Sequence, residues 1–309
     1  MSQAPPDKYS FLVGFEGEWR DTWWNADFLR LMAERWRLSD VTRALDVGCG
    51  VGHWGRTLLP FLPVEATFAG VDREASFAEK ANDKARELGI AHRATYRHAA
   101  IEELPFEDNT FDLVTCQTVL MHVADVPTAL AEMVRVCKPG GLLACVEPDN
   151  LAEATTFLRG SKGPAWSDFL SLLDFQHTCT LGKKALGRGD SDIGDLLPGH
   201  FARAGLTGIT VHQSDKCPAL IPPYQTRDQA IDLRQILEWI DAGIWLHGGG
   251  GPEDTKRNYL AGGGDPARFD ALLRLGLEVQ EQWKSAVIEG SYDGGRAVTA
   301  YLVSGRKPL

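Results

Sequence analysis

An aspartate followed by glycines at alternate positions, in the stretch DVGCGVG at 46–52, is the strongest sign of chemistry in this sequence. The apolar residues before Asp46 predict a buried strand, and the residues after the glycines predict the start of a helix. Glycines leave the intervening turn without side chains, so a ligand can lie directly against its backbone. A second carboxylate, Asp72, ends the next predicted strand. We therefore expect a ligand-binding site at the carboxyl ends of these two strands.

The spacing of the glycines distinguishes between ligand classes. A dinucleotide-binding turn has the pattern G-x-G-x-x-G, in which the third glycine lets the helix pack closely on the strand. Here His53 occupies the third position, and its side chain fits that role poorly. The pattern D-x-G-x-G-x-G from Asp46 to Gly52 therefore indicates a different ligand.

Alternating strand and helix patterns position this site on a sheet. Between about residues 40 and 150, short apolar strands alternate with amphipathic helices, which is typical of parallel strands joined by crossover helices. A helix, a glycine turn and a strand are predicted within 199–215. The predicted strands of the whole chain are 42–47, 66–72, 93–99, 111–117, 142–147, the end of 199–215, and 297–306, and the helices between them include 74–88 and 126–138.

The remaining segments have helical patterns of their own. An apolar stripe in 23–36 includes Leu31, and further helices are predicted at 164–177, about 227–246 and about 266–288. Glycine tracts at 247–254 and 260–265 predict mobile loops between the last two helices.

Four further motifs follow the glycine turn in a characteristic order: Asp72, the pair LPF at 104–106 and FD at 111–112, and KPGG at 138–141. Together they resemble class I S-adenosylmethionine-dependent methyltransferases, in the branch that includes quinone-biosynthesis and small-molecule enzymes. The resemblance covers about residues 40–150, with weaker agreement to the end of the chain.

The resemblance implies an α/β fold with a doubly wound, mostly parallel seven-stranded sheet, the Rossmann-like methyltransferase fold, carrying helical cap insertions. We expect an N-terminal helical lid at 1–40 and a cofactor-binding core at 41–215 and 298–309. A helical insertion at about 150–185 interrupts this core, and a helical cap occupies 216–297.

The resemblance also implies roles for the motif residues toward S-adenosylmethionine. Gly48 and Gly50 let backbone N–H groups approach the methionyl portion, and Asp46 places a carboxylate near its ammonium group. The Asp72 carboxylate accepts hydrogen bonds from the ribose hydroxyls. Arg73 lies along the adenine.

Three more cofactor residues follow from the same comparison. Gln117, at the end of the predicted strand 111–117, stands where the family uses a backbone carbonyl for the amino group. Ala100 replaces the aspartate that usually accepts from the adenine amino group, a side-chain hydrogen bond of about 0.5–1.5 kcal/mol. The backbone N–H of Ile101 can still donate to the ring.

Methyl transfer from a sulfonium is an in-line displacement, for which the protein aligns the reactants, excludes water and sometimes accepts a proton. His122, Glu147 and Asp149 fall at the carboxyl ends of strands, on the ligand-binding edge, and are the candidate bases. His122 and Glu147 are the predicted catalytic residues. Each has an alternative role: His122 in packing or on the cofactor side, and Glu147 as a hydrogen-bonding partner that fixes a loop.

The choice of acceptor depends on the segments outside the motifs. These segments carry the predicted acceptor-binding side chains, for which packing is the alternative: Tyr9, Trp19, Trp23, His177 and Tyr224. A roof built from them favours a small acceptor, with an O or N atom methylated in preference to C.

Composition narrows the classes of partner. A net charge of −10 over 309 residues makes a nucleic-acid partner unexpected. No targeting segment or bilayer-spanning stretch is recognisable. The six cysteines form no C-x-x-C pair or zinc-like cluster, so we expect reduced thiols, no metal and a cytoplasmic location. The alternatives to a small-molecule enzyme are a methyltransferase for tRNA or protein and a non-catalytic cofactor-binding module.

Overall fold

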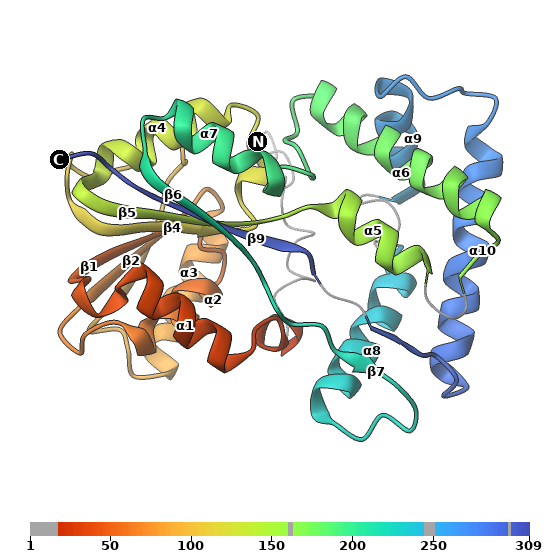
Figure 1. Ribbon diagram of the computed structural model, residues 1–309, viewed down its shortest axis with the longest axis horizontal. Coiled ribbons are helices and arrows are strands. Elements are labelled where there is room, and N and C mark those ends of the chain that lie inside the picture. Colours follow the sequence, from red (N-terminus) through yellow and green to blue (C-terminus); the bar gives the residue numbers. More distant parts are fainter. Residues whose placement is uncertain (1–17, 160–162, 244–250, 296–297) are drawn as a thin grey trace, which may run out of the picture.

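The computed structural model describes residues 18–159, 163–243, 251–295 and 298–309 (Figure 1). A sheet flanked by helices forms one end of the molecule, and a group of helices forms the other. Tyr9, and residues 247–250 of the first glycine tract, lie outside the described residues.

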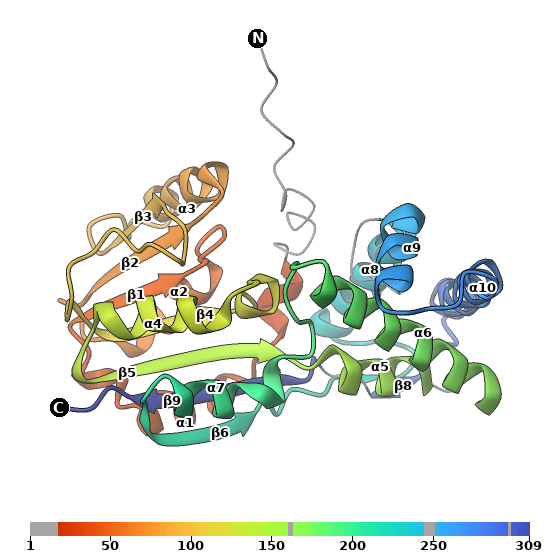
Figure 2. The ribbon, with the colours of Figure 1, turned by 90° about the horizontal axis from the view of Figure 1, so that it is seen from above.

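Within the described residues, one seven-stranded sheet has the order β3-β2-β1-β4-β5-β9-β6, seen face-on in Figure 2. Strand β9 is antiparallel to both of its neighbours, and the other pairs are parallel. This confirms the predicted fold class. The strands are β1 (Arg43–Val47), β2 (Thr67–Asp72), β3 (Ala94–His98), β4 (Phe111–Gln117), β5 (Cys137–Pro148), β6 (Thr207–Gln213) and β9 (Ala300–Arg306).

The strand order reverses between β1 and β4, because the chain first runs outward to β3 and then returns to the other side of β1. At such a reversal the loops at the carboxyl ends of the two central strands diverge and leave room for a ligand. The glycine turn follows β1, and Gln117 ends β4. The topology therefore brings both to this position.

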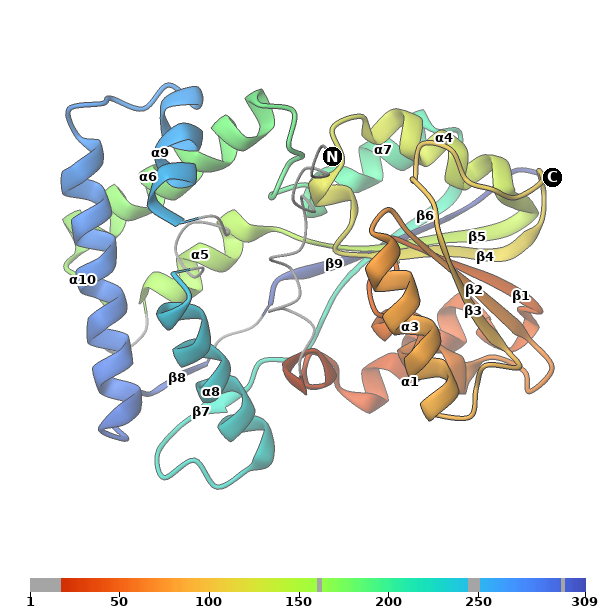
Figure 3. The same cartoon turned by 180° about the vertical axis from the view of Figure 1, so that it is seen from behind.

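Helices cover both faces of the sheet (Figures 1 and 3). One face carries α1 (Ala26–Trp36), α2 (His53–Leu58) and α3 (Ala75–Glu87), whose apolar residues form one buried cluster with the strands. The other carries α4 (Val126–Val136) and α7 (Leu197–Arg203). Short 3₁₀ helices complete the core: η2 (Glu18–Thr22), η3 (Leu38–Asp40), η4 (Leu59–Phe61), η5 (Leu120–His122) and η6 (Gly194–Leu196).

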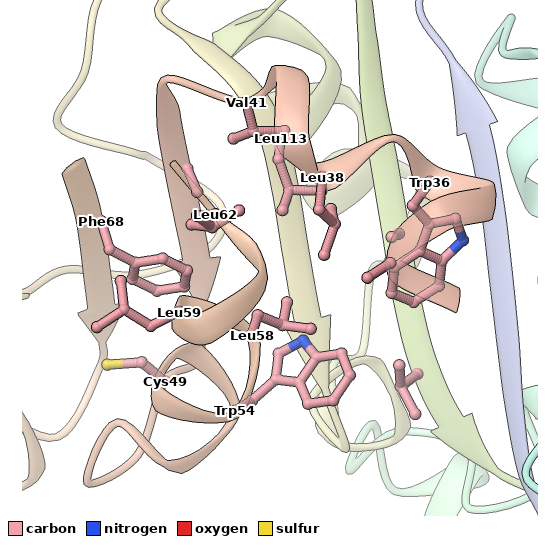
Figure 4. Packing of buried hydrophobic residues seen from close by; sticks show 14 of the residues in the cluster. Trp36, Leu38, Val41, Cys49, Trp54, Leu58, Leu59, Leu62, Phe68 and Leu113 are labelled. Carbon is pink, nitrogen blue, oxygen red and sulfur yellow. The ribbon is translucent and has the colours of Figure 1, made fainter. Parts of the chain in front are cut away.

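The predicted apolar stripe of the first helix packs against the sheet rather than over the ligand edge. Met32 and Trp36 are almost fully buried, and Trp36 lies beside Leu38 and across from Trp54 in the packed cluster of Figure 4. Leu31 is 42% exposed, so its assignment to the stripe was wrong. Helix α1 is thus part of the core, and η2 is the described part of the N-terminal segment that reaches the ligand edge.

The cap lies beyond the carboxyl end of β5, from which α5 continues directly (Figure 2). Helices α5, α6, α8 and α10 share a buried cluster that includes Leu172, Ile236 and Trp283, and α9 packs through Tyr259 in a second cluster. None of the described helices is long and apolar enough to cross a membrane. The cap elements are α5 (Asn150–Arg159), α6 (Trp166–Ala185), α8 (Arg227–Asp241), α9 (Gly251–Ala261), α10 (Phe269–Ile288), and the paired short strands β7 (Ala219–Leu220) and β8 (Gly294–Gly295).

Helix α9 occupies a segment where glycine tracts predicted mobile loops. Its neighbour Gly262 serves close packing instead, because a Cβ there would lie 2.0 Å from the Thr178 carbonyl oxygen of α6. On α6, a Cβ at Gly182 would lie 1.6 Å from the Asn258 carbonyl oxygen. These two glycines let α6 and α9 approach backbone to backbone.

Helix α8 begins with a capping box that offers a stability test. The Thr226 hydroxyl accepts from the Gln229 N–H at 3.2 Å, and the Gln229 side chain accepts from the Thr226 N–H at 2.9 Å. We expect Thr226→Ala to lower the free energy of unfolding by about 1 kcal/mol, the usual effect of losing such a cap. Thermal unfolding checks this, with Thr226→Ser as the control that keeps the hydroxyl. Equal stability of the two variants would contradict it.

Candidate functional site

The glycine turn forms a bare backbone cradle after β1. Gly48 has φ 66°, and a Cβ on it would lie 2.5 Å from the Val119 side chain. Gly52 has φ 78°, and a Cβ there would lie 2.7 Å from the Tyr96 hydroxyl. Since L-residues rarely adopt this conformation, both the backbone and the space require glycine. The structure confirms the tight turn that the sequence predicts.

Asp72 joins the end of β2 to this turn. One carboxylate oxygen accepts from the Gly50 N–H at 2.8 Å, and the other accepts from the Glu74 N–H at 2.9 Å. The side chain is 8% exposed. Each carboxylate oxygen can accept more than one hydrogen bond, so capacity remains for ligand hydroxyls.

Asp46 is buried behind the turn. One of its oxygens accepts from the Gly55 N–H at 3.1 Å, and within the described residues the other has no hydrogen-bond partner. Burial, with a smaller contribution from the charge of Asp72, raises the pKa of the Asp46 carboxyl to about 8. The Gly55 N–H and the cations Arg20 and Arg56 act in the opposite direction. A cationic ligand group beside Asp46 would favour its ionised form.

Arg20 is a site residue that sequence reasoning missed. From η2 its guanidinium donates to the Gln117 side-chain oxygen at 3.3 Å and to the Thr118 hydroxyl at 3.0 Å, at the end of β4. It also lies 4.8 Å from the centre of the Trp23 ring. The sequence offers one sign of this role, an arginine among aromatic residues. It does not reveal the contacts of Arg20, because its partners lie almost 100 positions away.

Gln117 presents a donor toward the same place. It is 5% exposed, and its amide nitrogen has no hydrogen-bond partner within the part of the chain that the structure describes. A buried amide of this kind normally has a partner, so the position fits a ligand acceptor group. Together with Arg20 it makes a donor set suited to a carboxylate.

His53 does not add a cation to this region. Its ring nitrogen Nε2 lies 2.9 Å from an Asp21 carboxylate oxygen. Burial, followed by the charge of Arg20, lowers the pKa of His53 to about 4, although Asp21 acts to raise it. The ring is therefore neutral near pH 7.

The loop after β3 lies beside the end of β2. The Ala99 N–H donates to the Asp72 carbonyl oxygen at 2.9 Å, which brings Ala100 and Ile101 next to Asp72. Ile101 is 8% exposed. Arg73 is exposed, and its backbone oxygen lies 2.9 Å from the His98 ring nitrogen. The structure thus gathers the residues predicted for the adenine side.

Glu147 is completely buried, and its carboxylate is engaged by backbone. It accepts from the N–H groups of Val119 at 2.9 Å, Leu120 at 2.8 Å and Met121 at 3.2 Å. Burial raises its pKa to about 7 in spite of these donors. The catalytic role suggested for Glu147 does not fit this geometry, because a group with no exposed surface cannot reach an acceptor. It fixes the loop that leads to His122, which is half-buried at the end of η5.

The predicted acceptor-binding residues have different surroundings. Trp19 packs edge-on against Trp239 of α8, with ring centres 4.4 Å apart. Tyr224 belongs to the cap cluster, and its hydroxyl donates to the Tyr292 carbonyl oxygen at 2.5 Å. Both take part in packing, which is the alternative role that the sequence leaves open for them.

Trp23, in the N-terminal segment, and His177, in the cap, are both partly buried. Trp23 is half-buried and stacks with Arg20. His177, on α6, has Nδ1 3.9 Å from a carboxylate oxygen of Asp192. Among the described residues, no three His, Cys, Asp or Glu side chains gather in a way that could hold a metal ion.

Comparison with known proteins identifies the domain that carries this geometry. The methyltransferase domain family matches residues 45–145. The demethylmenaquinone methyltransferase of Anoxybacillus flavithermus is 34% identical over 141 residues, covering 46% of this chain and 56% of that protein. That of Lactiplantibacillus plantarum is 37% identical over 110 residues, covering 36% and 46%. The chain thus spans about half the length of the curated relatives it matches.

A solved structure shares the fold over nearly the whole chain. Phosphoethanolamine N-methyltransferase 2 of Haemonchus contortus, solved with S-adenosyl-L-methionine, superposes with a TM-score of 0.51 at 17% identity. The match covers 98% of this chain and 59% of that one. At this identity the likeness shows the fold alone.

The strand order and the glycine turn define a Rossmann-like methyltransferase fold. Residues 45–145 match the methyltransferase domain family, and the curated relatives that align with this part of the chain are named demethylmenaquinone methyltransferases.

Proposed function

We propose that this protein transfers a methyl group from S-adenosylmethionine to a small-molecule acceptor, at an O or N atom in preference to C. The observation that carries the proposal is the intact pairing of the glycine turn with Asp72, joined by the hydrogen bond from the Gly50 N–H. The bare turn leaves its backbone open to the cofactor, and the carboxylate that braces the turn still has acceptor capacity for ribose hydroxyls.

The residues present fit the chemical groups of S-adenosylmethionine. Asp72 would accept from the ribose hydroxyls, and Asp46 with the Gln117 backbone carbonyl would hold the ammonium. Arg20 and the unpartnered Gln117 amide nitrogen suit the carboxylate. We assign the adenine to the side of Ala100, Ile101 and Arg73, as the resemblance implies.

The chemistry asks little of the protein beyond placement. When bound, the cofactor supplies an activated methyl group on a sulfonium. The chain orients the acceptor, excludes water and, for an O–H or N–H acceptor, removes a proton. We assign proton removal to the His122 imidazole, because its loop follows β4 at the ligand edge and is held in place by Glu147.

The acceptor class follows from the helices outside the matched domain. The cap stands beyond the carboxyl end of β5 (Figure 1). We infer that a cap at this position limits the approach of a large partner, and a net charge of −10 also disfavours a nucleic acid. Relatives named demethylmenaquinone methyltransferases support a small acceptor. We also propose a cytoplasmic location, in keeping with six free cysteines.

A labelled-methyl screen tests this function. The protein is incubated with a metabolite extract and S-adenosylmethionine carrying a heavy methyl group, and products are identified by mass. We expect one or a few labelled small molecules, absent with Asp72→Ala. Label in tRNA or protein instead would favour the macromolecule alternative. Binding of the cofactor without any labelled product would favour a non-catalytic module.

Replacing Arg20 tests the carboxylate assignment. We expect Arg20→Met to raise the Kd for S-adenosylmethionine by about 10-fold or more, the loss for a hydrogen bond between charged groups. Calorimetry measures this, with the exposed Arg30→Met on α1 as the matched control. An unchanged Kd with impaired acceptor use would instead place Arg20 on the acceptor side.

A further inference from the structure

Two charged side chains, one from the core and one from the cap, form hydrogen bonds with the backbone of the loop 119–122. From the core, the Glu147 carboxylate accepts from three consecutive N–H groups at its start. From the cap, the Lys183 ammonium of α6 donates to the Met121 carbonyl oxygen at 3.1 Å. Glu147 therefore binds N–H groups of this loop, and Lys183 binds one of its carbonyl groups.

Lys183 also binds the segment that follows α6. Its ammonium donates to the Ser191 hydroxyl at 2.7 Å. In the same segment, a Cβ on Gly189 would lie 2.3 Å from the Met121 carbonyl oxygen and 2.7 Å from the His122 Cα. Glycine at 189 thus lets this segment lie directly against the loop that carries His122.

A second contact ties this arrangement to α9. The Arg188 guanidinium donates to the two Asp254 carboxylate oxygens at 3.0 and 2.9 Å, and to the Asn258 side-chain oxygen at 3.0 Å. Because Arg188 neighbours Gly189, a movement of α9 or α6 relative to the core would be transmitted to the backbone of Met121 and His122.

A charged ammonium group is unfavourable at this buried position, because it loses its hydration. Burial lowers the pKa of Lys183 to about 8, and the nearby Arg188 acts in the same direction. Asp190, Asp192 and Glu147 act to raise it. An apolar side chain of similar length would avoid the desolvation of a charge. The charge is therefore better explained by what it holds than by stability.

We propose that Lys183 is a positioning residue for methyl transfer: with Glu147 it clamps the loop 119–122, so that docking of the cap helix α6 sets the orientation of His122 toward the acceptor. This inference rests on the proposed function for its chemical meaning. The clamp itself is a statement about structure, so it can be tested separately.

The test compares Lys183→Met and Lys183→Arg with Lys184→Met, a control on the same helix whose side chain is exposed and pairs with Asp190. The first readout is the ring signal of His122 in protein labelled with ¹⁵N-histidine, assigned with a His122→Gln variant. We expect this signal to shift or broaden in Lys183→Met, to be partly restored in Lys183→Arg, and to be unchanged in Lys184→Met.

The second readout separates positioning from cofactor binding. With the acceptor found by the labelled-methyl screen, we expect Lys183→Met to lower kcat by about 10-fold or more, since misplacing a reacting group has effects of this size. The Kd for S-adenosylmethionine should stay within about twofold of wild type, because Lys183 contacts Met121 and Ser191, neither of which is assigned to the cofactor.

Three outcomes would overturn the clamp. One is an unchanged His122 signal in folded Lys183→Met, and another is a loss of cofactor affinity equal to the loss of kcat. If Lys183→Met does not fold, Ser191→Ala, which removes the second partner of the ammonium, takes its place, and an unshifted His122 signal in that variant is the third. A wild-type protein without methyl-transfer activity would refute the proposed function, while the His122 signal would still decide the clamp.

Discussion

Replacing Asp72 by alanine is expected to raise the Kd for S-adenosylmethionine by about 100-fold or more. The ribose would lose two hydrogen bonds to a charged acceptor, each contributing ~1.5–3 kcal/mol in a typical case. The Gly50 N–H would also lose its partner, which loosens the cradle. Calorimetry on wild type and Asp72→Ala measures the change. Asp83→Ala serves as the control, because Asp83 is an exposed carboxylate that pairs with Arg86 on α3.

Two further measurements define what the result means. Asp72→Asn keeps one acceptor oxygen, enough for either the Gly50 or the Glu74 N–H group, and removes the charge, so it shows how much of the affinity depends on a charged acceptor. Unchanged affinity in Asp72→Ala would refute the ribose assignment. A wild-type preference for NAD over S-adenosylmethionine would refute the cofactor assignment altogether.

The core was predictable because its determinants are local. The strands from Arg43–Val47 to Ala300–Arg306 have apolar runs bounded by glycine, proline or charge, and such runs are readable without knowing their partners. The determinants of the glycine turn are equally local, because a positive φ and a lack of space for side chains both require glycine, which is visible in the sequence. Helix α9 lacked such a mark, because Gly262, directly after its C-terminal end, serves contact with α6.

Site residues outside the motifs were less predictable, because residue type does not tell what a side chain faces. Trp19 and Tyr224 have the aromatic character of a binding pocket, yet Trp239 and the Tyr292 carbonyl take their contacts. Glu147 has the chemistry of a base, but three backbone donors and full burial give it a different role. Arg20 reaches Gln117 through the tertiary fold. Each of these outcomes depends on residues far away in sequence.

Cofactor binding at pH 7 is expected to release up to one proton from Asp46. In the free protein the Asp46 pKa of about 8 keeps this carboxyl protonated at neutral pH. The cationic methionyl portion of the cofactor would stabilise the carboxylate and lower this pKa in the complex. Between the two pKa values the free protein binds more protons than the complex, so affinity increases as the pH is raised. This dependence, at most about tenfold per pH unit, ends above about pH 8, where Asp46 is already ionised in the free protein.

Folding stability has the opposite dependence on the same group. The Asp46 pKa is 3.8 in a model environment and about 8 in the folded chain. Between these values the folded protein holds a proton that the unfolded chain has lost, so the contribution of Asp46 to stability falls as pH rises. The cofactor therefore offsets an unfavourable buried charge when it binds, and wild type should gain more thermal stability from the cofactor at pH 8 than at pH 6.

Calorimetry between pH 6 and 9, in pairs of buffers that differ in ionisation enthalpy, measures the proton release. The control is Asp46→Asn, which keeps an acceptor for the Gly55 N–H but has no titrating group. Neighbouring His53, with a pKa of about 4, does not change its charge in this range. The cofactor's own amino group titrates at about 7.7–8.0, and Glu147 and Lys183 titrate nearby, but all three are common to both proteins. The difference between the two titrations therefore belongs to Asp46, and identical proton release in wild type and Asp46→Asn would show that this carboxyl does not face the cofactor's charge.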